Sequence, residues 1–598
     1  MRRPMEQIRP GQGPDEEKGS LSGEAGQAMV VVITVVLALV LIAGAVVAAG
    51  LGALTLSAGA KNNHTALAAA DAGVSDYVNR LQQDPNFWQN PSGDPAIGGW
   101  AAVPGGSNNG EYFTYTADTS ATATTGKVDL TVTGRVGNAT RTIRVVIARN
   151  SFLNYAYYSM YEQPDPTDTN IFPAGQASNV QKNCVYDENQ ANPTTGSVGP
   201  NWTWHSGSTH CTYLYWGTGN VVNGPAGSND NFFICGNPQF NGPVTSASMT
   251  KNPSGGTYPG WLQINSTDPS LGYAKGSCPG GSNPTFNGVP YSQGGNVTPG
   301  PYLGMPATDA QLIQYAQTGG CYYTGATSVT FNAPSTPSQP GTMTVSSPNS
   351  VLGTAVGQTN PSCVGTNVPL PSNGVIYVAD STSSHGCQAP SNPSGQQWQS
   401  NTSGSSGSNC QGNLFEQGVV GGQITTAAAN NVFITGSLCN PTDTNCVNNK
   451  TDPGNTVLTG NDVLGIIAQN FVYVYGPPCA EGIGSANSDG KDCQRPTNVT
   501  VDGAILDINH ALTVERLGQA PVMGQVAING SLIGRFGNLT ALTNSSGTIV
   551  NGYTTTVNTY DSRLRALSPP HFLNPVGAGW QPIKFGEVPN PTSLPAFP

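Results

Sequence analysis

The longest apolar run of the chain lies near its N-terminus. From Gln27 to Ala60 no residue is charged. A helix needs about 20 apolar residues to cross the hydrocarbon core of a bilayer, whereas the apolar part of a cleavable secretory signal has only about 7–15. The pattern therefore predicts a transmembrane helix over residues 27–60, preceded by a polar leader over residues 1–26.

A helical pattern continues beyond this run. Apolar residues recur at steps of three and four, which marks one face of an amphipathic helix. They are Leu67, Ala70, Val74, Tyr77, Val78 and Leu81. Proline is not tolerated in a helix interior, so the helix is expected to end before Pro85. One continuous helix would thus begin in the membrane and end against a folded domain.

Three small residues lie four positions apart within the apolar run, namely Gly44, Ala48 and Gly52. Small residues at this spacing allow a second helix to approach closely. They are therefore candidates for helix packing. The alternative is that they have no such role, since small residues are common throughout this run.

Strand patterns follow the helix. Alternation of apolar and polar residues predicts strands over residues 111–116, Lys127–Val136 and Ala139–Arg149. Gly137 and Asn138, between the last two, form a tight-turn signal. The end of the helix and a small antiparallel sheet are therefore expected over residues 61–150.

Two further regions complete the expected domain organisation. Residues 151–370 are dense in Gly, Asn, Pro and Ser, which predicts short strands joined by long turns. In residues 371–598, alternating apolar strands repeatedly meet Asn or Gly and then another short strand. That pattern favours a β-solenoid, with a β-sandwich as the alternative. The fold class is therefore α+β, with a long N-terminal helix, a small sheet and a large all-β region.

The composition excludes one class of partner. Only 9% of residues are charged, against about 25% in typical soluble proteins. Polarity comes instead from turn-forming residues, including 76 Gly and 47 Pro, and the net charge is −11. A nucleic-acid partner is not expected, because neutralising phosphates needs a basic surface and the chain has no long basic run.

Cysteine is confined to one side of the apolar run. All 12 cysteines lie between Cys184 and Cys493, and an even number beyond a membrane span predicts disulfides in an oxidising compartment. The pairs close in sequence are Cys439 with Cys446, and Cys479 with Cys493. The expected topology is a single-pass membrane protein with a cytoplasmic N-terminus and an extracellular bulk. Basic residues before the span favour the same orientation.

Motifs of catalytic chemistry are missing from the sequence. It contains no G-x-S-x-G elbow, no phosphate loop ending in Lys-Ser/Thr and no H-E-x-x-H helix, so neither an enzyme activity nor a cofactor is expected. No Cys/His cluster has zinc spacing. Asn487, Asp489 and Asp492 form a turn whose oxygens could hold calcium, but the turn lacks the spacing and terminal Glu of an EF-hand. A solvated turn is the simpler interpretation.

The N-terminal segments resemble a known family. SGEAGQAMVVVITVVLALVLIAG, followed by TALAAADAGVSDYVNRL, is similar to the N-terminus of PilX-type minor pilins and related pseudopilins. The resemblance implies a pilin-like sheet and cleavage by a prepilin peptidase after Gly26, which leaves Gln27 first; Gly23 is the other candidate. Most pilins carry a Glu that supports assembly where this chain has Val31. An unprocessed, permanently anchored protein is therefore the alternative.

A second resemblance covers roughly residues 225–245 and 370–575. Segments such as VIYVAD, NVFITGSL, DVLGIIAQN, DGAILD, INGSLIGRFG and YDSRLRALSPPHF resemble an uncharacterised domain found behind PilX-type N-termini in bacteria. The expected function is thus a non-enzymatic minor pilin or pseudopilin-like component that contacts other pilin or pilus-assembly subunits through its helix. The alternatives are a permanently anchored surface adhesin and a membrane-anchored enzyme acting on polysaccharide.

Overall fold

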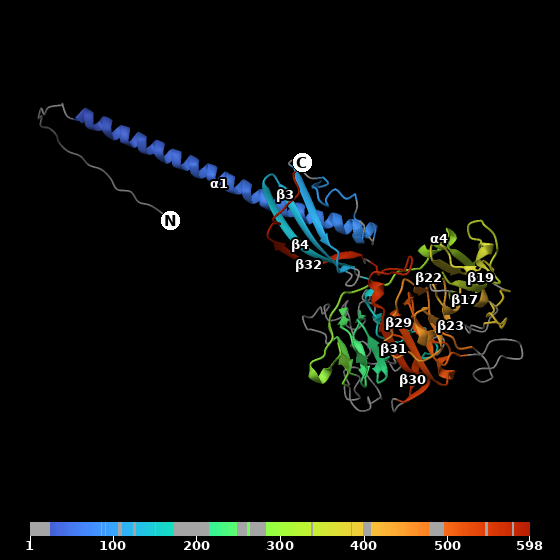
Figure 1. Cartoon of the computed structure of the whole chain (residues 1–598). Helices are drawn as coiled ribbons and strands as arrows, with labels where there is room; N and C mark the ends of the chain where they lie inside the picture. The colour runs from blue at the N-terminus through green and yellow to red at the C-terminus, as the bar shows by residue number, and fades with distance from the viewer. Residues whose placement is uncertain are drawn as a thin grey trace, which may run out of the picture.

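The computed structural model describes residues 24–597, with gaps at 85–86, 90, 92, 106–109, 123–126, 150, 173–213, 248–259, 264–282, 336–338, 384–385, 399–407, 478–494, 545–547 and 577–578. It consists of a long helix, a small sheet packed on the C-terminal half of that helix, and a large β-rich body (Figure 1). The predicted fold class is confirmed at this level: a long apolar helix precedes an antiparallel sheet and a large β-rich region.

Helix α1 spans Glu24–Gln83 without interruption and contains 60 residues. At about 1.5 Å per residue it is about 90 Å long, roughly three times the thickness of a hydrocarbon core. In the described part of the chain it is the one helix long and apolar enough to cross a membrane. The prediction of a helix able to span a membrane is thus confirmed, as is its end before Pro85.

The C-terminal half of α1 packs on the small sheet through the predicted apolar face. Its buried side chains include Ala66, Ala69, Ala70, Val74, Tyr77 and Leu81. The Tyr77 ring meets the Tyr115 ring edge-on, with 5.1 Å between centroids. The helix backbone passes so close to Gly134 of the sheet that a Cβ there would overlap the Ala66 carbonyl oxygen.

The small sheet has five antiparallel strands in the order β1-β2-β3-β4-β32. They are β1 (Ala101–Ala102), β2 (Glu111–Asp118), β3 (Lys127–Val136), β4 (Ala139–Arg149) and β32 (Trp580–Val588). Strands β3 and β4 have the predicted bounds, and β2 runs two residues beyond its predicted end. Gly137 takes a φ of 58° between β3 and β4, which explains why a glycine stands in this turn.

Strand β32 comes from the C-terminal end of the chain. It pairs with β4, from Trp580 opposite Arg149 to Val588 opposite Thr142. Trp580 at its start is buried in the same core as the helix face. The prediction that residues 371–598 form a single domain is therefore wrong. Because β32 is otherwise mostly exposed, its sequence gave no pattern that pointed to its partner. The β-rich body is inserted between β4 and β32.

The β-rich body contains two ladders of parallel strands. The first is, in spatial order, β16 (Cys321–Thr324), β20 (Val375–Ala379), β22 (Gln423–Ala428), β24 (Val463–Ala468), β27 (Ala504–Asp507), β29 (Val522–Phe536), β5 (Tyr157–Tyr161), β8 (Ala226–Ser228), β11 (Val244–Ser246) and β15 (Thr298–Pro299). The second contains β17 (Thr327–Asn332), β21 (Leu414–Val419), β23 (Val432–Cys439), β25 (Val472–Val474), β28 (Leu512–Val514), β26 (Val499–Val501), the first half of β29, β31 (Ile549–Tyr560), β7 (Asn220–Asn223), β10 (Gln239–Phe240) and β13 (Thr285–Phe286). Apolar side chains between the ladders form the largest core.

Shorter elements complete the body. Antiparallel additions are β14 (Val289–Pro290), β18 (Thr342–Ser346), β19 (Gly365–Pro369) and β30 (Ala541–Thr543). A third, parallel sheet holds β6 (Trp216–Gly217), β9 (Phe232–Cys235) and β12 (Trp261–Gln263). The short helices in the described residues of the body are α4 (Gln311–Gln317) and α5 (Thr444–Val447).

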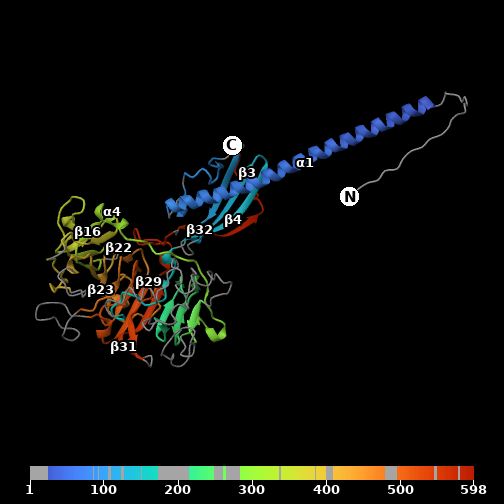
Figure 2. The same ribbon diagram turned by 180° about the vertical axis from the view of Figure 1, so that it is seen from behind.

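The ladder strands do not stack in the order of the chain. The chain enters in the middle at β5, builds outward to β15 at one end, continues from β16 at the opposite end and returns to β29, which pairs with β5. Figures 1 and 2 show the green and yellow segments on opposite sides of the orange and red strands. The predicted boundary at residue 370 is therefore wrong, since β16 and β20 pair across it. Gly, Asn and Ser mark turns of one body here, not a separate domain.

A line of asparagine side chains crosses neighbouring turns of the body. Asn430 donates to Asn413 at 2.8 Å, and Asn470 donates to Asn430 at 2.6 Å. Asn509 continues the line by donating to Asn470 at 3.3 Å. Stacked amides satisfy one another where parallel strands repeat in register. The Asn residues that follow apolar strands in the sequence are thus part of the stacking.

Candidate functional site

The exposed apolar half of α1 is the first candidate surface. Its large side chains are more than half exposed, such as Leu39 at 59% and Leu51 at 60%. An apolar surface of this extent marks contact with a membrane or with other proteins. Gly44, Ala48 and Gly52 lie within it at four-residue steps, and a side chain at Gly44 would meet nothing within 4 Å. Their contact with another helix stays a prediction.

The predicted processing residues lie at the start of the same helix. Gly26 and Gln27 are in the first turn of α1, which begins at Glu24. Val31, one turn further on, is exposed. Residues 1–23 of the predicted leader lie outside the described residues, so cleavage after Gly26 stays a prediction.

A polar cluster joins the end of α1 to the small sheet. Arg80 Nε lies 2.8 Å from Asp76 and 3.1 Å from the buried Asp94. The Tyr115 hydroxyl donates to both aspartates. Burial, assisted by the charge of Asp94, raises the pKa of the neighbouring Tyr77 to about 12. These contacts hold the helix end and the sheet in one orientation.

Disulfides cross-link the β-rich body. Three described bonds join Cys321 to Cys363, Cys387 to Cys410 and Cys439 to Cys446. The third is the predicted one. The other two were not predicted, because connectivity of distant cysteines does not follow from spacing. No described cysteine is free, whereas the predicted pair Cys479 and Cys493 lies outside the described residues.

Loss of the Cys439–Cys446 bond should be measurable. Replacing both residues with serine is expected to lower the free energy of unfolding by about 2 kcal/mol, because the short closed loop gains freedom in the unfolded chain. Urea unfolding of the detergent-solubilised chain would measure this. Peptide mapping without reductant should recover the linked peptides, and free thiols at both positions in protein purified without reductant would contradict the assignment.

Three buried carboxylates meet around one asparagine in the second ladder. Asp443 caps α5, Asp452 lies in the following loop, and Asp502 comes directly after β26. Asn529 of β29 directs Nδ2 at Asp452 Oδ2 (2.8 Å), Asp502 Oδ1 (2.9 Å) and Asp443 Oδ2 (3.5 Å). None of the four residues is more than 4% exposed. We call this group the aspartate cluster.

Backbone N–H groups fix the orientation of each carboxylate in the aspartate cluster. One oxygen of each accepts backbone N–H groups at 2.6–3.1 Å, and the other oxygen faces Asn529. The N–H donors are Asn445 and Cys446 for Asp443, Gly454 for Asp452, and Asn440 for Asp502. The three oxygens that face Asn529 are thus set in place by the fold.

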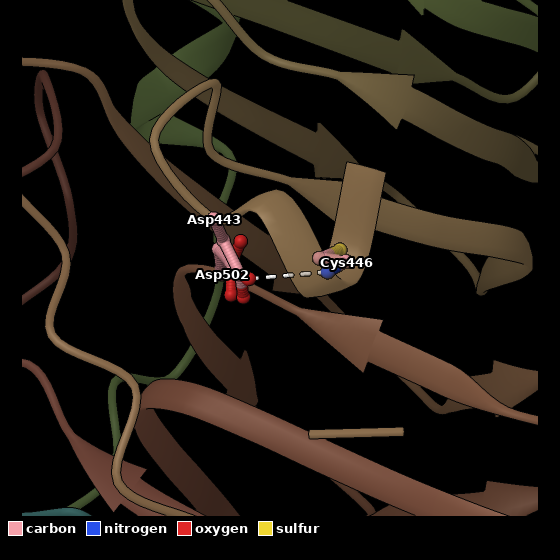
Figure 3. Close-up of side chains that lie close together, drawn as sticks. All are labelled: Asp443, Cys446 and Asp502. Atoms are coloured by element: carbon pink, nitrogen blue, oxygen red, sulfur yellow. Dashed lines mark hydrogen bonds between the residues drawn. The ribbon is translucent and has the colours of Figure 1, made fainter. Parts of the chain in front are cut away.

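Figure 3 shows the carboxylates of Asp443 and Asp502 side by side, with Cys446 further along α5. One potential ligand atom from each lies within 4.8 Å of the other two. The Sγ of Cys446 is bonded to Cys439 and offers no thiolate, so oxygen is the donor that this cluster presents. Burial raises the pKa of Asp502 well above its usual range, and the charges of Asp443 and Asp452 raise it further.

Sequence reasoning missed the aspartate cluster. Asp443 and Asp452 lie in a visibly Asn- and Asp-rich stretch, but Asp502 and Asn529 join them only through the pairing of β23, β26 and β29. The calcium candidates that were predicted, Asn487, Asp489 and Asp492, lie outside the described residues.

Another buried carboxylate has ample hydrogen bonds. Glu162 accepts from Tyr157 (2.7 Å), Trp216 Nε1 (2.8 Å) and Ser159. Burial raises its pKa to about 7, and these donors oppose the rise. With both oxygens paired, Glu162 is a structural group that joins β5 to β6.

Comparisons with known proteins do not identify a family for this chain. No protein-family model matches the chain, and no curated protein matches it. Among solved structures, the chain is similar to the competence-associated pilin ComZ from Thermus thermophilus, with 11% identity and a TM-score of 0.23 over 88% of this chain and 97% of that chain. A score this low does not establish a common fold.

Proposed function

We propose that this chain is a minor pilin or pseudopilin-like component of a type IV pilus or its assembly machinery. The supporting observation is the division of α1: its N-terminal half exposes apolar side chains, and its C-terminal half packs on an antiparallel sheet. The exposed half would cross the cell membrane and pack with helices of other pilin or pilus-assembly subunits, with Gly44, Ala48 and Gly52 allowing close approach. The N-terminus would be cytoplasmic and the body extracellular.

The proposed role is mechanical and not enzymatic. The helix and small sheet would form a stem that resembles PilX-type proteins, and the body would project from it as a contact surface. We also propose that the body is a β-solenoid and not a β-sandwich. In-register parallel pairing in both ladders and the line of asparagine amides support that assignment.

A permanently anchored surface adhesin is the second candidate. Val31 supports it, because an apolar residue at this position cannot supply the carboxylate that most pilins use in assembly. This candidate has the same anchor and body but would keep its leader and stay out of filaments.

Mass spectrometry of the N-terminus, in cells with and without a prepilin peptidase, tests the proposal. The chain is expected to begin at Gln27 only where the peptidase is present. A peptidase-dependent start at Glu24 would move the cut to Gly23 and keep the proposal. An intact Met1 in both strains would contradict it and favour the anchored adhesin.

A further inference from the structure

The aspartate cluster has an imbalance of charge. Asp443, Asp452 and Asp502 direct three carboxylate oxygens at one amide nitrogen, which has only two hydrogens to donate. Within the described part of the chain, no Lys, Arg or His forms an ion pair with any of them. Buried carboxylates without a counter-charge are strongly unfavourable, and buried charges are therefore normally paired or bound to metal.

Asn529 supplies a second, independent sign of a ligand. Its side chain is 1% exposed, and its Oδ1 is buried without a hydrogen-bond donor among the described residues. A half-turn of the amide exchanges its nitrogen and oxygen. Oδ1 would then face the three carboxylate oxygens. Four oxygens brought together in this way repel one another unless a cation lies between them.

We propose that Asp443, Asp452, Asp502 and Asn529 bind a calcium ion. Calcium prefers oxygen ligands at about 2.3–2.6 Å, and two such ligands separated by roughly 70–90° lie about 2.6–3.7 Å apart. The 2.8, 2.9 and 3.5 Å separations around Asn529 match that spacing. Magnesium fits less well because it retains several waters, and zinc is disfavoured because the Cys446 sulfur beside the carboxylates is in a disulfide.

The bound ion would join three separate parts of the chain. Asp443 and Asp452 come from the segment after β23, Asp502 follows β26, and Asn529 lies on β29. The Cys439–Cys446 disulfide begins the same segment. Calcium would thus help to attach this segment to the second ladder. The attachment lies where the chain passes from the second ladder to the first.

The test uses the full chain in detergent, treated with EDTA and then titrated with calcium chloride or magnesium chloride. Calcium at about a hundred times its dissociation constant is expected to raise the thermal midpoint by roughly 5 °C, and magnesium at the same concentration should raise it less. Isothermal titration calorimetry should show binding of calcium alone. A parent chain that neither carries calcium before EDTA treatment nor responds to added calcium would overturn the proposal.

Variants separate a binding site from a structural cluster. Asp502→Asn is expected to abolish the calcium response yet be at least as stable as the parent in EDTA, because it removes one of three like charges. Asp230→Asn, at a buried aspartate outside the cluster, should keep the response. Retention of the full response in Asp502→Asn, or its loss in Asp489→Asn instead, would show that the ion lies elsewhere and would refute the assignment.

Discussion

Replacing Gly134 with alanine is expected to destabilise the helix–sheet unit by about 3 kcal/mol, because overpacking at a backbone contact leaves little room to relax. A Cβ at this position would overlap the Ala66 carbonyl oxygen and the Ala70 nitrogen. Both atoms belong to the backbone of α1, so no side-chain rotation can relieve the contact. The helix must therefore move away from β3 and expose part of the core around Tyr77 and Val132.

Hydrogen–deuterium exchange of the detergent-solubilised chain would measure this effect. Faster exchange is expected in peptides that cover residues 66–81 and strand β3. Gly586→Ala is the matched control, since Gly586 lies in the same sheet and an added Cβ there meets nothing within 4 Å. Equal exchange in the two variants would contradict the close approach of α1 to Gly134.

Replacing Glu416 with glutamine is expected to change how stability depends on pH. Glu416 is fully buried between Val329 and Ile434, its neighbours in the second ladder, and burial raises its pKa to about 8. Above pH 4.5 the unfolded chain releases this proton while the folded chain keeps it, so stability falls as pH rises and levels off above about 8. Glutamine has no proton to release and removes this contribution.

The stability of Glu416→Gln relative to the parent should therefore rise by at most about 1.4 kcal/mol per pH unit between pH 5 and 8, or about 3 kcal/mol in total. Unfolding midpoints in urea across this pH range would measure it. Glu587→Gln serves as control, because Glu587 is exposed on β32 and pairs with Arg141 at the surface. If both variants follow the parent in parallel, Glu416 does not titrate between these values.

The pattern of neighbouring residues predicted helix α1 and strands β3 and β4 well. The three- and four-residue steps from Leu67 to Leu81, the tight-turn signal at Gly137 and the alternation in β3 are all set by neighbours in sequence. Their bounds and the buried face of the helix agree with the structure for that reason. The Cys439–Cys446 bond followed in the same way, since its partners are only seven positions apart in the sequence.

Features that depend on distant partners could not be predicted. Strand β32 exposes most of its side chains, so its sequence does not distinguish pairing with β4 from any other edge position. The pairing of β5 with β29 also could not be predicted from the sequence, because apolar strands of similar composition could stack in many orders. The aspartate cluster depends on that stacking, and Asn529 alone in its strand resembles an ordinary polar residue.

The body is inserted between β4 and β32, and this determines when the small sheet can close during synthesis of the chain. Strand β4 leaves the ribosome before the body does, and one of its edges stays unpaired until β32 has been synthesised. The tail behind β32 then seals the unit, where Phe597 meets the Tyr112 ring at 5.0 Å. The small sheet therefore closes only after the body between β4 and β32 has been synthesised, and its closure reports that this body is present. A copy truncated before β32 would keep β4 as an open edge strand and would thereby differ from a copy that contains β32.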